Sequence, residues 1–254
     1  MAPLRLLITG CNRGIGYELL QQLVEQQNPP KQIFATCRDP SSSQNKKLND
    51  FAAKHPNVVV LKLESTDANS IKEAAKEVGK HLNGAGLNLL INNAGIMPES
   101  TLDSADSDDF MNVYSTNVVG PFLVAKELLP FLKKAAEENS QKPLSCSKSA
   151  IINVSTRLGS IANVSESYKD YPVLSYRCSK AALNMLTQCQ SQGYKKDGIL
   201  CTALHPGWVQ TDLGGCHAPL TVEQSVQGIL KVLDSLSEKH SGILIGWDGN
   251  VIPW

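Results

Sequence analysis

The chain has 254 residues, of which 42% are apolar and 19% charged, an ordinary globular composition. Its 24 basic and 24 acidic residues cancel, so no positive field is available to attract nucleic acid or an anionic membrane surface. The longest apolar runs fall well short of the roughly 18 residues that a membrane-spanning helix needs, and we expect no such helix.

The cysteines and the first residues bear on location. The seven cysteines contain no CxxC pair, which favours reduced thiols over a disulfide or zinc framework. The first apolar stretch is short and runs straight into a glycine turn, unlike a secretory signal. We therefore expect a cytoplasmic protein without a metal site.

Short apolar runs alternate with longer helical segments along the whole chain. The runs are mostly continuously apolar, as in parallel strands that are buried on both faces. We expect about seven strands, at Leu4–Thr9, Gln32–Cys37, Val58–Leu63, Leu87–Asn92, Ile151–Ser155, Ile199–His205 and Ile243–Gly246. Apolar residues at helical spacing lie between them, first at Ile15, Leu19 and Leu23 and then over Asn69–Leu82, Asn117–Ala136, Leu174–Tyr194 and Val222–Leu236.

This alternation predicts an α/β fold: a doubly wound parallel sheet flanked by helices, or Rossmann fold, in a single nucleotide-binding domain of residues 1–254. Such sheets bind ligands at the carboxyl ends of their strands, near the reversal of strand order. Two stretches lack a regular pattern, Glu138–Ser149 and Leu158–Pro172. The second is too long for an ordinary connection, and we expect it to line a site.

A glycine-rich turn follows the first predicted strand. Residues Thr9–Gly16 read TGCNRGIG and open the first helix, where backbone amides and the helix N-terminus favour a pyrophosphate. The spacing is GxxxGxG rather than the GxGxxG of the common dinucleotide motif, and a purely structural turn is the alternative. The strand–turn–helix context favours a nucleotide site.

The end of the second predicted strand bears on cofactor choice. It reads Cys37-Arg38-Asp39, whereas NAD enzymes usually place an acid here to hold the ribose 2′-hydroxyl. Arg38 and Arg13 are candidates to bind the 2′-phosphate of NADP(H) by charge-assisted hydrogen bonds. Asp39 is contrary to this interpretation, since it would serve NAD if the strand ended later.

Tyr176 and Lys180 lie one turn apart on one face of a predicted helix. A phenol has an unperturbed pKa of about 10, and a nearby ammonium favours its phenolate form and lowers that pKa. Lys180 is also long enough to reach a ribose hydroxyl. The YxxxK pattern is common by itself, so its meaning depends on the motifs that precede it.

Over nearly its whole length the chain resembles the short-chain dehydrogenase/reductase family. The family's motifs occur in order: TGxxxGxG at Thr9–Gly16, NNAG at Asn92–Gly95, the helix asparagine at Asn117, YxxxK at Tyr176 and Lys180, and PG at Pro206-Gly207. The segments His205–Asp212 and Trp247–Trp254 resemble one branch in particular, the sniffer-type carbonyl reductases and the bacterial C-factor proteins.

The resemblance implies a role for each matching residue. Tyr176 would be the general acid, Lys180 would lower its pKa and hold the nicotinamide ribose, and Asn117 would anchor a water beside Lys180. The implied cofactor site consists of Gly10, Asn12, Arg13, Gly14, Ile15, Gly16, Arg38, Glu64, Ser65, Asn93, Ala94, Gly95, Tyr176, Lys180, Pro206, Gly207, Val209 and Thr211. Cys37 stands where NAD-preferring members carry an acid, which supports NADP(H).

One position departs from the family pattern. The catalytic serine of the family is replaced by Thr156, whose hydroxyl can donate the same hydrogen bond. Ser155 is the alternative. The gap from Thr156 to Tyr176 is longer than usual in the family, and we expect the extra residues, around Ser165–Asp170, to reshape one wall of the pocket.

Several residues are candidates for the rim of the substrate site. Met97, Tyr168, Tyr171 and Trp208 follow predicted strand ends, and as a group they indicate an apolar or aromatic pocket. The segment Leu213–Pro219 is either a lid over the nicotinamide or a simple turn. We expect His205 to be a packed structural residue rather than a base.

The leading hypothesis is NADPH-dependent reduction of a ketone, aldehyde or quinone, with a small carbonyl compound as substrate. By resemblance, two copies would pair through Asn117–Ala136 and Leu174–Tyr194, which implies a homodimer or homotetramer. A C-factor-like signalling or scaffold protein with little turnover is the main alternative. A methyltransferase on the same fold is a third hypothesis, although Tyr176 and Lys180 have no obvious task there.

Overall fold

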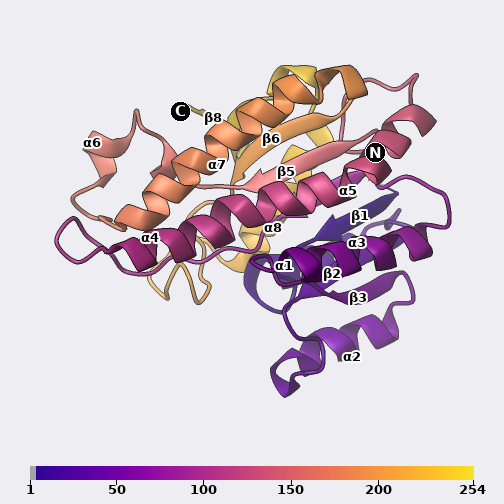
Figure 1. Cartoon of the computed structure of the whole chain (residues 1–254), viewed down its shortest axis with the longest axis horizontal. Coiled ribbons are helices and arrows are strands. Elements are labelled where there is room, and N and C mark those ends of the chain that lie inside the picture. The colour runs from indigo at the N-terminus through magenta and orange to yellow at the C-terminus, as the bar shows by residue number, and fades with distance from the viewer. Residues whose placement is uncertain (1–3) are drawn as a thin grey trace.

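The computed structural model describes residues 4–254, so residues 1–3 of the expected domain lie outside the described part (Figure 1). Its centre is an eight-stranded sheet in the order β3-β2-β1-β4-β5-β6-β7-β8. The strands are β1 (Arg5–Ile8), β2 (Gln32–Cys37), β3 (Val58–Lys62), β4 (Leu89–Asn92), β5 (Ala150–Val154), β6 (Leu200–His205), β7 (Leu244–Gly246) and β8 (Val251–Ile252).

The sheet is parallel from β3 to β7, and only β8 pairs antiparallel, with β7. Every residue of β4 and β5 is buried, which explains why these strands read as continuous apolar runs. The doubly wound parallel sheet is confirmed. Its strand order reverses at β1, which lies between β2 and β4, so the crevice expected to bind a ligand opens where β1 and β4 end.

Helices cover both faces of the sheet (Figure 1). One buried cluster contains Leu19 and Ile229 from the helices of one face, and the other contains Ile71 and Leu128 from the opposite face. The helices are α1 (Gly14–Glu25), α2 (Lys46–Lys54), α3 (Ala68–Leu82), α4 (Ser107–Tyr114), α5 (Gly120–Glu138), α6 (Val164–Ser167), α7 (Leu174–Gly193) and α8 (Val222–Ser235).

Four helices or strands were not expected from the sequence: β8, α2, α4 and α6. Strand β8 has only two residues, too few for a readable alternation, and it raises the strand count from about seven to eight. Helices α2 and α4 each bury a single residue, Leu48 and Val113, so neither carries the wide apolar stripe that reveals a core-facing helix.

Two boundaries differ from the sequence-based prediction in ways that bear on the site. The helix expected from Asn117 begins at Gly120, and it is preceded by a π-turn over Ser115–Val119. Such turns are rare and occur frequently at functional sites. The stretch expected to be irregular after Leu158 contains a 3₁₀ turn (Arg157–Gly159) and α6.

None of the helices within residues 4–254 is both long enough and apolar enough to span a bilayer.

Candidate functional site

A cleft of about 880 Å³ opens at the carboxyl ends of the central strands, within the size range of small-molecule sites. Most of the residues singled out from the sequence border it: Gly10, Asn12, Arg13, Gly14, Ile15, Arg38, Glu64, Ser65, Asn93, Ala94, Gly95, Ser155, Tyr176, Lys180, Pro206 and Thr211. The others, Gly16, Asn117, Thr156, Gly207 and Val209, are not among its lining residues. Asp39, considered above as a possible NAD-binding acid, also borders the cleft, as do Asn112 and Thr116, for which no motif predicted a binding role.

The glycine turn brings two backbone segments into direct contact. Gly10 has φ +72°, a left-handed conformation that favours glycine. A Cβ on Gly16 would collide with the carbonyl oxygen of Gly10 and lie 2.7 Å from Nδ2 of Asn93. The start of α1 can therefore pack against the ends of β1 and β4 only with glycine at position 16.

Asn93 and Thr9 join the ends of β1 and β4. The Thr9 hydroxyl accepts hydrogen bonds from the backbone amides of Asn93 (2.9 Å) and Ala94 (3.0 Å). In return, Nδ2 of Asn93 donates to the Thr9 carbonyl at 2.9 Å. This exchange fixes the NNAG segment against the glycine turn and leaves Ala94 and Gly95 along the cleft.

The end of β2 presents both a cation, Arg38, and an acid, Asp39, to the cleft. Cys37 is buried, whereas the Arg38 side chain is 79% exposed, with its Nε 4.0 Å from Oε2 of Glu64. The Asp39 carboxylate accepts from the amide and the hydroxyl of Ser41 at 3.0 and 2.6 Å, and these hydrogen bonds lower its pKa. Asp39 is therefore occupied within its own turn.

Arg13 has a partner that the sequence did not predict. Its Nη1 lies 2.7 Å from Oδ2 of Asp212, which belongs to the loop after β6. Both residues border the cleft, so the ion pair joins the glycine turn to this loop. The 199-residue separation of the two side chains in sequence explains why no local pattern could reveal the pair.

Tyr176 and Lys180 lie together in the wall of the cleft, 7% and 5% exposed. Lys180 Nζ donates to the carbonyl oxygen of Val154 at 2.7 Å and lies 5.7 Å from the centroid of the Tyr176 ring. Burial lowers the pKa of Lys180 to about 8. Burial raises the pKa of Tyr176, and a hydrogen bond with Thr156 opposes that rise.

The direction of the Tyr176 shift differs from the sequence-based expectation. The neighbouring ammonium was expected to lower the pKa of the phenol, yet in this structure the cost of burying a phenolate is the larger effect. The phenol therefore keeps its proton at neutral pH.

The structure distinguishes the two candidate hydroxyls. Ser155 borders the cleft, but its hydroxyl donates to Oδ1 of Asn184 at 2.6 Å inside the protein. The Thr156 hydroxyl accepts from the amide of Leu158 at 3.2 Å and bonds to the Tyr176 side chain. Of the two hydroxyls, that of Thr156 is the one placed beside the phenol.

Asn117 is fully buried in the π-turn, and its amide is held on three sides. Its Oδ1 accepts from the Ile96 amide, while Nδ2 donates to the Ile96 carbonyl and to the Ser179 hydroxyl, all at 2.9–3.0 Å. A Cβ on Gly95 would lie 3.2 Å from Asn117 Oδ1 and 3.6 Å from Lys180 Nζ, which places both groups beside Gly95. The expected water at Asn117 stays a prediction.

The loop after β6 is closed by its own hydrogen bonds. Trp208 Nε1 donates to the Gly214 carbonyl at 2.7 Å, and the Gly214 amide donates to the Thr211 hydroxyl at 3.0 Å. Gly207 has φ +87°, and a Cβ there would collide with Leu220. A lid movement of this loop stays a prediction.

An aromatic pair adjoins the loop after β6, which contributes Pro206 and Thr211 to the cleft. The residues expected at the rim are not among those that line the cleft: Met97, Tyr168, Tyr171 and Trp208. The rings of Tyr171 and Trp208 meet edge to face, with their centroids 5.4 Å apart. His205, at the end of β6, has its pKa lowered to about 4 by burial and is therefore neutral at pH 7. That state fits the expected structural role.

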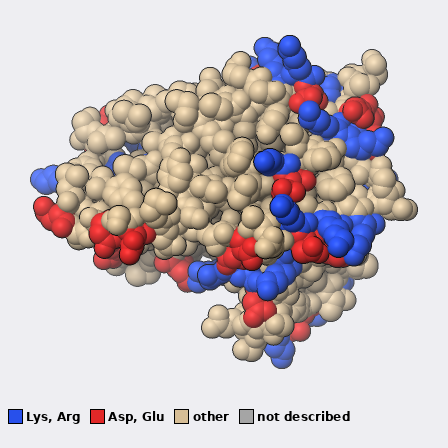
Figure 2. Space-filling view, in the orientation of Figure 1, with Lys and Arg blue, Asp and Glu red and all other residues tan. Residues whose placement is uncertain are grey.

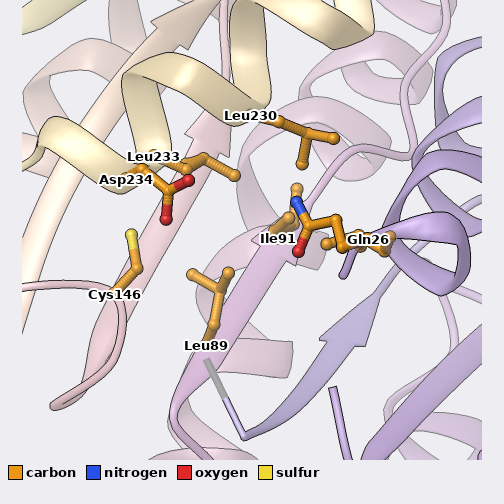
Figure 3. Close-up of a pocket in the computed structure, with 8 residues that line it drawn as sticks. Gln26, Leu89, Ile91, Cys146, Leu230, Leu233 and Asp234 are labelled. Carbon is orange, nitrogen blue, oxygen red and sulfur yellow. The ribbon is translucent and has the colours of Figure 1, made fainter. Parts of the chain in front are cut away.

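A second cavity lies away from this cleft, between α8, the end of α1 and β4 (Figure 3). Its volume is about 10 Å³, and its lining is mainly apolar, including Leu89, Ile91 and Leu230. A space of that size holds about one water molecule, so it is not a ligand site. Residues 4–254 contain no cluster of side chains suited to a metal ion.

Comparison with known proteins agrees with these features. A family model described as short chain dehydrogenase matches residues 5–217. The chain is 52% identical to an NADPH-bound carbonyl reductase from chicken fatty liver, with both chains covered completely and a TM-score of 0.96. It is 38% identical to the carbonyl reductase Sniffer of D. melanogaster, covering 99% of this chain and 100% of that one, with a TM-score of 0.94.

A bacterial relative belongs to the second group that the sequence resembled. C-signal of Myxococcus xanthus is 36% identical over 169 residues, which are 66% of this chain and 93% of that protein. The expected likeness to sniffer-type reductases and C-factor proteins is confirmed. On the family match and the structural agreement together, the chain belongs to the short-chain dehydrogenase/reductase family of oxidoreductases.

Proposed function

We propose that this protein is an NADPH-dependent carbonyl reductase that acts on ketones, aldehydes or quinones. The observation that carries the proposal is the Tyr176 phenol, which keeps its proton in the cleft wall beside the Thr156 hydroxyl and the Lys180 ammonium. A reductase needs a proton donor at the place where the carbonyl oxygen gains charge, and such a phenol meets that need at neutral pH.

The residues of the cleft fit a phosphorylated dinucleotide. The N-cap of α1 is Arg13, which makes no side-chain capping bond, and the first turn contains no acid, so free amides face the cleft for a diphosphate. Arg38 offers a guanidinium for a 2′-phosphate where Cys37 replaces the acid expected of an NAD site. The 52% identical chicken reductase binds NADPH, which supports the same choice here.

Each residue of the set has a distinct task in the proposed reaction. Bound NADPH supplies the hydride. Lys180 holds the nicotinamide ribose, while Tyr176 and Thr156 hydrogen-bond the carbonyl oxygen as negative charge develops on it. Tyr176 then transfers its phenolic proton to that oxygen, and the ammonium of Lys180 stabilises the phenolate that is left.

A signalling protein with little turnover is the second candidate, favoured by the likeness to C-signal. The buried Tyr176–Thr156–Lys180 set argues for turnover, because burying ionisable groups is costly where no chemistry requires them. Tight NADPH binding without turnover of a broad carbonyl panel would favour the signalling alternative. Membership of an oxidoreductase family leaves methyl transfer without support.

The helices of one face suit the pairing of two copies of the chain. Figure 2 shows a broad area almost free of charge over α7 and the first part of α5, with acidic side chains at its border near α4. Helices α4, α5 and α7 expose four large apolar residues: Met111, Tyr114, Phe122 and Met185. We propose that copies of the chain pair through this face, as a dimer or within a tetramer; a cytoplasmic location stays a prediction.

Replacing Tyr176 by Phe tests the proposed acid. We expect kcat for isatin or an aromatic quinone to fall by about 10²–10⁴, because the proton donor is lost while the ring remains. The measurement is NADPH oxidation, with NADPH affinity expected to change little. Tyr194→Phe, a tyrosine outside the cleft, is the matched control, and undiminished turnover by Tyr176→Phe would refute the assigned role.

A second set of variants separates the two hydroxyls. Thr156→Val should lower kcat by about 10²–10³, the usual cost of one lost oxyanion donor, whereas Thr156→Ser should retain activity. Ser155→Ala leaves a buried oxygen of Asn184 without its donor, so it should cost about 1–3 kcal/mol of stability and little kcat. The reverse pattern would assign the catalytic role to Ser155.

The lowered pKa of Lys180 predicts how activity falls at alkaline pH. Because burial lowers its pKa to about 8, the ammonium is present below that pH and is lost as the pH rises through it. We expect kcat/KM for NADPH, which reports groups of the free enzyme, to fall above about pH 8. In Lys180→Arg this fall of kcat/KM near pH 8 should disappear. A wild-type kcat/KM that falls only near the ordinary pKa of lysine would contradict the prediction.

Replacing Arg38 by Ala tests the preference for NADPH over NADH. Arg38→Ala should raise KM for NADPH about tenfold, the effect of losing roughly 1.4 kcal/mol, and leave KM for NADH nearly unchanged. Lys47→Ala removes a cation outside the cleft and is the control. Equal effects on the two cofactors would show that Arg38 does not read the 2′-phosphate.

A further inference from the structure

Arg177, the residue after Tyr176, is a buried cation that the proposed reaction does not use. It lies in the first turn of α7 and is only 6% exposed. Within residues 4–254 it has no carboxylate partner in an ion pair; the nearby Glu166 is paired with Arg157 instead, at 2.9 Å. A guanidinium is costly to bury in this way, so its partners must compensate.

The partners of Arg177 all belong to one segment, residues 158–171. Its Nε donates to the Tyr171 carbonyl at 2.7 Å, and Nη2 donates to the carbonyl and the hydroxyl of Ser167 at 2.8 and 3.1 Å. Nη1 makes a longer bond to the Leu158 carbonyl, at 3.4 Å. The guanidinium also lies 5.7 Å from the centroid of the Tyr168 ring. One side chain therefore holds the beginning, the middle and the end of this segment.

The segment has little else to hold it. From Ile161 to Pro172 no residue is buried, so apolar packing cannot fix its course. Its remaining contacts are few and include the Arg157–Glu166 ion pair and a bond from the Ala162 amide to the Trp254 carbonyl at 3.0 Å. Figure 1 shows α6 projecting beyond the sheet, near the start of α7 and the C-terminus.

Both ends of the segment adjoin the proposed reaction site. Leu158 donates its amide to the Thr156 hydroxyl, and a Cβ on Gly159 would lie 2.8 Å from Cβ of Lys180. At the other end, the ring of Tyr171 meets Trp208, whose loop contributes Pro206 and Thr211 to the cleft. The course of the segment therefore decides where Tyr171 stands relative to the phenol.

We propose that Arg177 is a positioning residue for the substrate: by clamping residues 158–171 to α7 it fixes the aromatic pair of Tyr171 and Trp208 beside the cleft. This inference rests on the proposed carbonyl reductase function. Substrates large enough to extend from the cleft to this aromatic pair depend on the clamp. The smallest carbonyl compounds, which contact only the groups around Tyr176, do not.

The first test measures the clamp without turnover. Arg177→Met removes the guanidinium and keeps the aliphatic stem, whereas Arg177→Lys keeps the positive charge but loses the branched set of N–H donors. The control is Glu166→Gln, which breaks an exposed ion pair of the same segment. We expect amide hydrogen exchange over residues 160–171 to accelerate in both Arg177 variants while exchange of the sheet strands is unchanged. Wild-type exchange rates over residues 160–171 in both variants would overturn the clamp.

The second test compares substrates of two sizes, menadione and 2,3-butanedione. In Arg177→Met and Arg177→Lys, KM for menadione should rise about tenfold, while KM for butanedione and the Kd of NADPH stay within about twofold. An equal loss with both substrates would overturn the positioning role and leave Arg177 a structural residue. A wild-type protein that reduces neither compound would overturn the proposed function itself, and the exchange experiment would still decide on the clamp.

Discussion

A lysine ammonium buried against a main-chain carbonyl organises the centre of this protein. Lys180 Nζ donates to the Val154 carbonyl at 2.7 Å and so ties α7 to the end of β5. The backbone makes room for it, since a Cβ on Gly159 would lie 2.8 Å from Cβ of Lys180 and one on Gly95 would lie 3.6 Å from its Nζ. Tyr176, one turn earlier on α7, lies in the wall of the same cleft.

Burial acts on these two groups in opposite directions. It disfavours the charged form of each, so the pKa of Lys180 falls to about 8 while that of Tyr176 rises. At neutral pH a protonated phenol thus stands beside a charged ammonium. That combination suits a proton donor whose conjugate base must then be stabilised, which is what carbonyl reduction requires.

Helix α7 carries two buried cations, Lys180 and Arg177. Their hydrogen bonds go to main-chain carbonyls and one hydroxyl rather than to carboxylates. Lys180 lies in the wall of the cleft, and Arg177 holds the segment 158–171, which ends at the Tyr171–Trp208 pair. Carbonyl partners leave each cation its positive charge without adding a negative one to the site. The same rigid helix thereby supports both the reacting groups and the wall that a substrate would meet.

The architecture could be predicted because its signals are local. Continuous apolar runs identify buried parallel strands, and helical periodicity identifies the helices that cover them. The same reasoning missed β8, which has two residues. It also missed α2 and α4, which bury one residue each, and α6, which buries none. Elements with so little buried surface form because neighbours in space complete them, and no local pattern records those neighbours.

Some features of the candidate site could also be predicted from the sequence, and others could not. The sequence alone determined the glycine turn and the shared face of Tyr176 and Lys180, because a tight turn and a helical repeat depend on residues close together in the chain. Only the tertiary structure decided that Ser155 turns to Asn184 while Thr156 meets the phenol, and that Arg13 pairs with Asp212. Those outcomes depend on which distant side chain supplies the nearest partner, and packing sets that distance.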